Sequence, residues 1–300
     1  MISLAPFRYR HAMDPATGPI ARLETYRMPV CGHSLFHTNA FLAPGLQRSA
    51  NTPTVYGNAA GSGTDESPVV ARHKAVSEAL ERWAFHDVSA LPDGQKYGFH
   101  VDPSSNGMAA FPGIGTGGAR QAAWLEAIER FCLIGWWQGS VDARRRNSLW
   151  SGIHAIEFLH GFDKASVVLL VHEAEPDLIV YGHAAADTFE DACKRASIEL
   201  ARNELVIRRF RSLHPGPVDQ HLNSVADLFE RRSLFFSTPA GFRAVLKKGR
   251  QSARTLLAKP CVVFDGEIPG RWSEFTTVWR VVLEPPTLEF LQNRDDWFFW

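Results

Sequence analysis

Two short segments of this 300-residue chain carry acidic side chains in the same pattern. KAVSEALERW contains Glu78 and Glu81, and WLEAIERFCL contains Glu126 and Glu129. Residues three or four apart share one face of a helix, so each segment presents two carboxylates side by side. Carboxylates gathered in a partly buried place repel one another unless a cation neutralises them. Because Mg²⁺ binds oxygen ligands, often one or two carboxylates together with substrate phosphates, the repeated pair indicates a magnesium site.

An arginine follows each acidic pair and allows a second interpretation. Arg82 lies four residues after Glu78, and Arg130 lies four residues after Glu126. Ion pairs at this spacing on a solvated helix face stabilise a helix by about 0.2–0.5 kcal/mol each. On a buried face, the same guanidinium groups would position the acids or contact phosphate oxygens. The residues alone leave the surface ion pairs and the metal site both open.

The composition is that of an ordinary globular protein and argues against several function classes. Lys+Arg and Asp+Glu both total 32, so no global field favours nucleic acid or an anionic membrane. The longest apolar run, Val167–Val171, is much too short to cross a bilayer, and the N-terminal segment lacks the apolar stretch of a secretory signal. The four cysteines have no CxxC spacing, as expected for reduced thiols. We expect a cytoplasmic protein that contacts neither nucleic acid nor membrane.

The hydrophobic patterning predicts an α/β fold, with mixed sheets flanked by three acid-bearing helices. Each helix follows a glycine-containing stretch, which suggests a repeated supersecondary unit. Thr188 and Asp191 are placed as an N-cap and a first-turn acid for the third helix. The expected helices begin after Ser67-Pro68, at 119 (to about 137) and at 188 (to about 211), and the expected strands are 166–173, 178–185, 259–266 and 276–286.

The burial pattern and the organisation of the chain follow from the same elements. Residues 1–65 are expected to form short strands and loops. Since no linker separates the pieces, we expect a single domain over 1–300, with core motifs in 55–210 and C-terminal strands and an aromatic tail in 255–300. The residues expected to be buried are Val69, Ala75, Ala79, Leu80 and Trp83 on the first helix, and Ala123, Leu125, Ile128, Phe131 and Cys132 on the second.

These motifs in their order resemble the YcaO family. ARHKAVSEALERW looks like the family's first ExxER helix, and SSNGMAAFPGIGTGGARQAAWLEAIERFCLIGWW looks like its Ser-Asn-Gly turn and second ExxER helix. GHAAADTFEDACKRASIELARNE resembles the family's later strand end and helix, so the likeness covers about residues 55–210. The resemblance implies a YcaO-type fold and an ATP-dependent enzyme that activates a backbone amide of a peptide in the biosynthesis of a ribosomally made natural product. An attacking side chain would yield an azoline, sulfide a thioamide, and a backbone amine an amidine.

The resemblance also implies roles for individual residues. The acids would hold Mg²⁺ ions that bridge the phosphates of ATP, and phosphoryl transfer depends on such positioning and charge neutralisation. The two arginines, with Glu81 and Glu129, would form the catalytic set. The implied metal ligands are Glu78, Glu81, Glu126 and Glu129; the implied phosphate-facing or acid-positioning groups are Arg82 and Arg130; the implied nucleotide-lining residues are Lys74, Ser105, Asn106, Glu199 and Arg202.

Departures from the family pattern keep alternatives open. Lys74 stands where members often have Ser, and Ile114 and Gly118 stand where Asn and Glu are common. A scaffold that binds a partner or peptide, or a nucleotide-binding regulator, would tolerate these changes. We also expect a protein without the proline-rich tail of many members and without an attached leader-binding domain. The expected partners are therefore a peptide substrate and a separate leader-peptide-binding or TfuA-like protein, and a homodimer stays open.

Other constellations predict less. GIGTGG satisfies GxGxxG but follows no clear strand, and GxxxxGK[ST] is absent, so neither a Rossmann site nor a P-loop is favoured. His33 and His37 fit polar loop residues better than zinc ligands because no third ligand is near. His183 fits a structural histidine better than a general base. The basic runs at 144–146 and 247–250 suit solvated surface or an acidic partner. The aromatic tail is expected to pack on the domain or on a partner, and the alternative is that it reaches into the active site.

Overall fold

The computed structural model describes residues 2–46, 55–250 and 260–298. The chain forms two compact units, which we call unit 1 and unit 2. Unit 1 comprises Met1–Ala50, Asn58–Ala127 and Cys261–Glu284, and unit 2 comprises Asn51–Gly57, Ile128–Pro260 and Pro285–Trp300. The single domain expected from the sequence stays a prediction. Across the described ranges, no helix is both long and apolar enough to span a bilayer.

The first sheet of unit 1 is an antiparallel sheet in the order β1-β2-β3. Cys31 and Gly32 both have positive φ, 46° and 87°, which closes β1 and β2 into a tight hairpin. The expectation of short strands and loops in this region is wrong, because the two strands are long and a helix, α1, precedes them. The sequence does not indicate this turn, because Cys-Gly is not among the common sequences of two-residue hairpin turns. The bounds are α1 Ala5–Ala12, β1 Ile20–Val30, β2 His33–Leu42 and β3 Gly61–Asp65.

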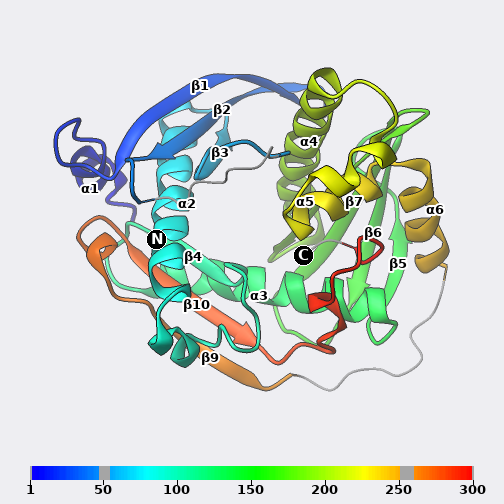
Figure 1. The fold of residues 1–300 in the computed structure, drawn as a ribbon. Coiled ribbons are helices and arrows are strands. Elements are labelled where there is room, and N and C mark those ends of the chain that lie inside the picture. The colour runs from blue at the N-terminus through cyan, green and yellow to red at the C-terminus, as the bar shows by residue number, and fades with distance from the viewer. Residues whose placement is uncertain (1, 47–54, 251–259, 299–300) are drawn as a thin grey trace. The chain divides into compact units, whose positions relative to one another are not determined.

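Helix α2 (Pro68–Ser89) packs directly on β3 (Figure 1). A side-chain carbon on Gly61 would lie 2.4 Å from Ala75 O, so the glycine allows the strand and helix to approach closely. Ser67 caps the helix as expected, by accepting a hydrogen bond from Val70 N. The prediction that Val69 belongs to the buried face of this helix is wrong, because the residue is 55% exposed. It lies two positions before Ala71, about 200° around the helix from the buried stripe.

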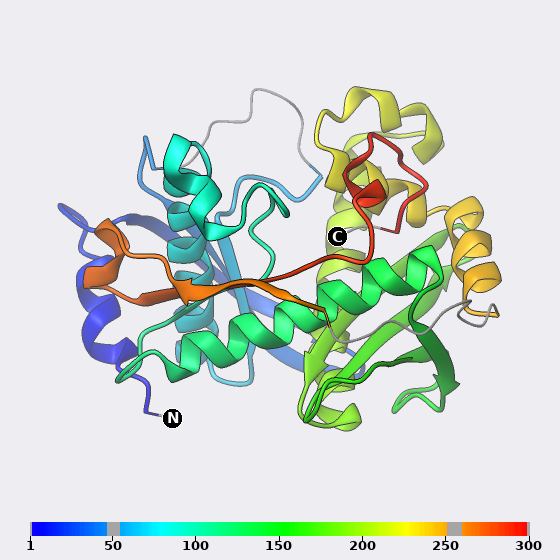
Figure 2. The same cartoon turned by 90° about the horizontal axis from the view of Figure 1, so that it is seen from below.

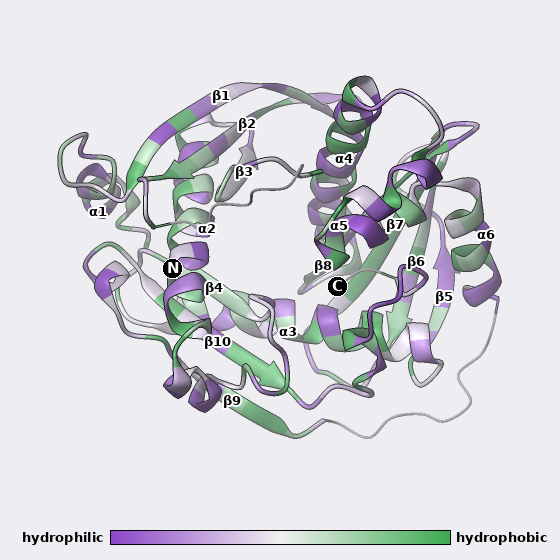
Figure 3. Cartoon of the chain, in the orientation of Figure 1, coloured by the Kyte–Doolittle hydropathy of each residue, from purple (hydrophilic) through white to green (hydrophobic). Residues whose placement is uncertain are grey.

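The predicted burial of α2 is otherwise confirmed, and a second sheet completes unit 1. Ala75, Ala79, Leu80 and Trp83 are buried, and the Trp83 ring meets Trp272 edge-on at 5.8 Å. The second sheet has the antiparallel order β4-β10-β9, and Figure 3 shows the hydrophobic colour along β10. The two late strands expected from the sequence are therefore present. The bounds are β4 Met108–Phe111, β9 Val262–Glu267 and β10 Thr277–Leu283, with 3-10 helices at Pro92–Tyr97 and Arg271–Glu274.

Helix α3 (Gly117–Gln138) is one continuous helix (Figure 2), as predicted to within two residues at each end. Its first part belongs to unit 1 and its second part, from Ile128, to unit 2. Leu125 is only half-buried, whereas the other residues expected in its apolar face are buried: Ala123, Ile128, Phe131 and Cys132.

Unit 2 is built on an antiparallel sheet in the order β5-β6-β7-β8. Helix α4 lies on β8, where a side-chain carbon on Gly182 would come within 2.0 Å of Ala196 O. Thr188 caps α4 as predicted, by accepting a hydrogen bond from Asp191 N at 3.1 Å. The bounds are β5 Asp142–Arg146, β6 Ile153–Leu159, β7 Ser166–Glu175, β8 Leu178–Ala186, α4 Phe189–Leu213, α5 Leu228–Phe236 and α6 Pro239–Lys248, with 3-10 helices at Val218–Gln220, Leu222–Ser224 and Glu289–Leu291.

The C-terminal segment packs on unit 2, as expected for the aromatic tail. Trp297 and Phe298 are each 3% exposed, and the Phe298 ring lies 5.1 Å from that of Phe236. The fully buried Arg232 donates hydrogen bonds to the carbonyls of Phe290, Gln292 and Arg294, so one guanidinium satisfies three backbone acceptors. The last two residues of the tail, 299–300, lie outside the described residues.

Candidate active site

Glu81 is the centre of an acidic cluster in unit 1. Burial raises the pKa of its carboxyl well above 4.5, and the negative charges of Glu126 and Glu78 raise it further. Arg82 and a hydrogen bond from the Ala110 backbone act in the opposite direction without cancelling the shift. Three acids from α2 and α3 therefore interact as a group, and a bound cation would remove the repulsion between them.

Glu78 is fixed by the strand in front of its helix. Its Oε2 accepts hydrogen bonds from the backbone N of Ser62 at 3.0 Å and from the Ser62 hydroxyl at 3.2 Å. The i,i+4 ion pair with Arg82 is present, but its N–O distance is 4.0 Å and both side chains are partly exposed. A pair of that kind contributes little to stability. The ion pair is therefore present, but the hydrogen bonds from Ser62, rather than this pair, fix the position of Glu78.

Arg82 reaches the Ser-Asn-Gly turn that the sequence singled out. Its Nη1 donates to the hydroxyl of the buried Ser105 at 2.5 Å. Asn106 is half-buried, and its side-chain amide donates to the Ser104 hydroxyl at 2.8 Å. The structure thus brings together Glu78, Arg82 and Ser105 through one ion pair, between Glu78 and Arg82, and one hydrogen bond, from Arg82 to Ser105 in the turn.

Arg280, which the sequence did not mark as a site residue, supports the Ser-Asn-Gly turn. Arg280 of β10 is fully buried, and it donates to Ser104 O at 2.8 Å and to Asp102 O at 2.7 Å. Its guanidinium carbon also lies 3.8 Å from the centre of the Phe99 ring. No local signal marked Arg280, because its hydrogen-bond partners on the turn are more than 170 residues earlier in the chain.

The ammonium group of Lys74 already has protein partners, which argues against a simple phosphate-binding role. Its Nζ donates to Asp65 Oδ2 at 2.9 Å and to Thr64 O at 3.1 Å. Burial, the largest influence, raises the pKa of Asp65, but the hydrogen bond and charge of Lys74 together with backbone donors lower it overall. Lys74 therefore has an anionic partner at the end of β3.

Glu129, the second acid of the second motif, lies in unit 2 and has a different setting. Its Oε1 is 2.5 Å from His183 Nδ1, and its Oε2 accepts from Ala185 N at 2.9 Å. Burial, the largest influence, lowers the pKa of His183, but the charge and hydrogen bond of Glu129 outweigh it, so the pKa is raised overall. Both oxygens of this carboxylate are thus engaged by β8.

The remaining predicted residues of unit 2 lie on α3 and α4. Arg130 is 7% exposed, and its guanidinium carbon lies 5.1 Å from the centre of the Phe290 ring. Arg202 Nη1 pairs with Glu199 Oε1 at 2.6 Å, and the Glu199 side chain is 47% exposed. Glu199 contributes to the raised pKa of His183, so its field reaches the Glu129–His183 pair.

The acidic cluster fits magnesium by its chemistry rather than as a closed cage. Within the described residues, no group of three or more His, Cys, Asp or Glu side chains forms a ready-made metal site. Mg²⁺ rarely uses an all-protein cage and takes substrate phosphates as ligands, so an acid group with only oxygen donors is compatible with it.

His37 is no zinc ligand candidate, because its two ring nitrogens contact Thr64 Oγ1 and Asn39 Oδ1. Ile114 is 72% exposed in the loop before α3, whereas Gly118 is buried.

The comparisons with known proteins define the fold. No family model matches this sequence, and no curated protein matches it. The chain is similar to the solved structure of YcaO from Methanopyrus kandleri bound with AMPPCP and Mg2+, with a TM-score of 0.61 and 14% identity over 94% of this chain and 90% of that chain. It is also similar to chains of the E. coli microcin synthetase McbBCD complex, with a TM-score of 0.53 and 11% identity over 86% of both chains.

A second structure of that synthetase complex, with pro-MccB17 bound, gives a TM-score of 0.55 and 10% identity over 86% of both chains. The chain therefore has the YcaO fold. The resemblance predicted from the two ExxER motifs is confirmed at the level of the fold, together with the mixed α/β class.

Proposed function

We propose that this chain is an ATP- and Mg²⁺-dependent enzyme that activates a backbone amide of a peptide, for azoline, thioamide or amidine formation. The observation that carries the proposal is the acidic cluster around Glu81 beside the Arg82–Ser105 hydrogen bond. The M. kandleri structure, which contains AMPPCP and Mg2+, supports a nucleotide, and the synthetase with pro-MccB17 bound supports a peptide substrate.

The acids would bind the cations that supply the positive charge the reaction needs. Glu78, Glu81, Glu126 and Glu129 would hold Mg²⁺, and when bound it would neutralise the charge that develops on the transferring phosphoryl group. Burial and the negative charges of the neighbouring acids disfavour the ionised form of Glu81, and a bound cation would relieve this, so the site favours cation binding. Ser62 keeps Glu78 oriented, and this reduces the ordering that metal binding requires.

The groups next to the acids would contact and position the nucleotide. Arg82 joins α2 to the turn, so it would align the acids with Ser105 and Asn106 at the nucleotide. Arg130, Glu199 and Arg202 are proposed to complete the shell, and Lys74 would contribute only if it exchanged Asp65 for a phosphate.

The reaction proposed has two bond-forming steps on the peptide. The nucleophile's electron pair attacks the amide carbon, and the carbonyl electron pair moves to oxygen. That oxyanion attacks the γ-phosphorus of ATP while the bond to ADP breaks. The C–O bond then breaks and phosphate leaves, while an electron pair on nitrogen (azoline or amidine) or on sulfur (thioamide) forms the new double bond to carbon and the released protons pass to solvent. The chain's own contribution is positioning and charge, because this chemistry requires no covalent enzyme intermediate.

A second candidate is a homologue of the fold that binds a peptide or partner without catalysis. The pairing of Lys74 with Asp65, and of both Glu129 oxygens with His183 and Ala185, favours it. In that case nucleotide binding would be weak or absent. Turnover of ATP that depends on a peptide separates the two candidates.

The first test is calorimetric titration of ATP with Mg²⁺ into the wild-type protein and the Glu81→Gln variant. We expect magnesium-dependent binding in the wild type and its loss in the variant. Glu66→Gln is the matched control, since Glu66 is an exposed acid just before α2, and it should bind like the wild type. Equal binding by the wild type and Glu81→Gln would refute the metal role of the cluster.

A further inference from the structure

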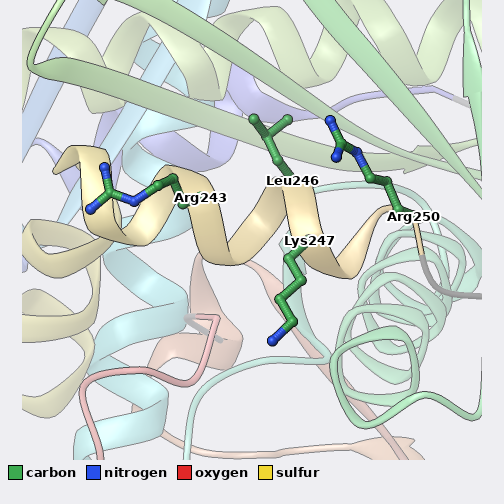
Figure 4. Close-up of a pocket in the computed structure, with 4 residues that line it drawn as sticks. All are labelled: Arg243, Leu246, Lys247 and Arg250. Carbon is green, nitrogen blue, oxygen red and sulfur yellow. The ribbon is translucent and has the colours of Figure 1, made fainter.

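Helix α6 carries a basic face that the proposed function does not use. Arg243 and Lys247 are one turn apart, Arg250 follows just beyond the helix end, and all three are exposed. Together with Leu246 they line an open hollow of about 360 Å³ (Figure 4). In this view Leu246 and Arg250 turn to one edge of the helix and Lys247 to the other. The hollow therefore combines cationic groups with one apolar side chain.

The neighbouring sheet ends in a basic strand. In the order β5-β6-β7-β8, β5 pairs on one side with β6, and no other described strand pairs with it. Arg144 and Arg146 both bind Glu157, so they share one face of the strand. Arg145 alternates with them and is exposed on the opposite face. An edge strand presents unpaired backbone N–H and C=O groups along its outer side.

Arg145 and the end of α6 lie on the same face of the sheet. Arg145 pairs across the strands with Ile156, and directly opposed residues project to one face. A side-chain carbon on Gly249 would lie 3.7 Å from Ile156 Cδ1, so the C-terminal end of α6 packs beside this pair. The basic strand and the basic helical face therefore form one surface within unit 2, which we call the β5–α6 surface.

Arg144 and Arg146 share the carboxylate of Glu157, but the other four cations of this surface lack such a partner among the described residues. Arg145, Arg243, Lys247 and Arg250 have no carboxylate within ion-pair distance among the described residues, although the whole chain is neutral. Like charges that gather without counter-ions are favourable places for an anionic partner. The lining has no aromatic side chain for base stacking, so a single-stranded nucleic acid is the poorer fit.

We propose that the β5–α6 surface binds an acidic, extended segment of a polypeptide, which pairs with the outer side of β5 while its carboxylates meet the basic residues of α6. Main-chain pairing to a sheet edge provides affinity, and side-chain contacts provide selectivity. The unpaired charge of Arg145 repels a basic strand and attracts an acidic one, so the charge that protects the edge also favours an acidic partner. An apolar residue of the segment would rest on Leu246.

The test uses the full-length protein and a fluorescein-labelled peptide of about twelve residues in which Glu and Val alternate, a length that spans one edge strand. Fluorescence anisotropy should report binding that weakens as salt increases. The double variant Lys247→Glu/Arg250→Glu, and separately Arg145→Glu, should each weaken binding by about tenfold or more. The matched control is Arg10→Glu/Lys96→Glu, which reverses two exposed cations of unit 1 and should bind like the wild type.

Two further probes distinguish strand pairing from charge attraction alone. The same peptide with two central prolines keeps its charge but loses backbone donors, so it should bind several-fold more weakly. Circular dichroism and melting should match among all variants, since the changed residues are exposed. Equal affinity of the double variant and the wild type, equal affinity of the proline peptide, or tighter binding of an oligouridine than of the acidic peptide would each overturn the proposal.

Discussion

The two ExxER motifs have the same letters and different surroundings. In the first, Glu81 belongs to an acidic cluster that raises its pKa, and Arg82 is half-exposed and reaches Ser105. In the second, the corresponding acid, Glu129, is bound by a histidine and a backbone N–H. Like-charge repulsion therefore acts on Glu81 in the first motif, whereas both oxygens of Glu129 in the second motif have hydrogen-bond partners. Sequence equality of two motifs does not imply equal electrostatics.

The sharpest way to break this comparison is to remove the same charge from each motif. If both acids serve one metal set, Glu129→Gln should weaken magnesium-dependent ATP binding by at least about 10–100-fold, in the same direction as the loss expected for Glu81→Gln. Calorimetric titrations of the two variants under identical conditions measure this. Wild-type affinity of Glu129→Gln beside a loss in Glu81→Gln would remove Glu129 from the metal set and leave it as the partner of His183.

The two motifs should also differ in how they affect folding. Glu129→Ala removes the acceptor for His183 Nδ1 and Ala185 N, so we expect a loss of about 1.5–3 kcal/mol in the free energy of unfolding. Urea titration measures it. Glu129→Gln is the control, because it keeps an acceptor for one of the two donors and should lose less. A loss below that of Glu129→Gln would contradict the contacts described.

In the absence of metal, Glu81→Gln should increase the free energy of unfolding, whereas Glu129→Ala should decrease it. The folded-state pKa of Glu81 lies above the unfolded value of 4.5, so the wild type loses stability as pH rises from 4.5 through the raised pKa. Below pH 4.5 the carboxyl is protonated in the folded and the unfolded state, so its ionisation no longer affects the free energy of unfolding. At neutral pH without metal the variant should therefore be more stable by about 0.5–2 kcal/mol. Thermal melting at several pH values, with a chelator present, checks this; a variant less stable than the wild type at pH 7 would contradict it.

Much of the fold could be predicted because its elements have local signals. Ser67-Pro68 and Thr188 mark helix starts, and the β-branched residues of β7 and β8 surround a short turn, so these elements follow from neighbouring residues. The β1–β2 hairpin could not be predicted in the same way, because Pro29 and many polar residues interrupt its hydrophobic pattern. Helices α5 and α6 have only 9 and 10 residues, too few for a strong period.

The candidate site was predicted in its residue types and not in its contacts. The acids and Arg82 followed from motif spacing, because a helix places side chains three or four residues apart together, whereas Ser105 was implied by the resemblance to the YcaO family. The contact between Glu129 and His183 joins residues 54 positions apart, and that of Arg280 with the turn joins residues 176 apart. Such contacts come from tertiary packing, of helix α3 against β8 in the first case and of β10 beside β4 and the turn before it in the second, and no periodicity in the sequence encodes them.

The smallest effect tests whether the strand end beside the first motif belongs to the site. Lys74→Ala removes an ion pair with Asp65 in which the Lys74 side chain is 50% exposed, so it should cost only about 0.2–1 kcal/mol of stability. If Lys74 stays with Asp65 when nucleotide binds, ATP affinity should change less than threefold, measured by calorimetry. Asp65→Asn is the matched control, because it frees Lys74 without removing its charge. Tighter ATP binding in Asp65→Asn together with weaker binding in Lys74→Ala would show instead that Lys74 exchanges its partner for a phosphate, and that the first motif extends to the end of β3.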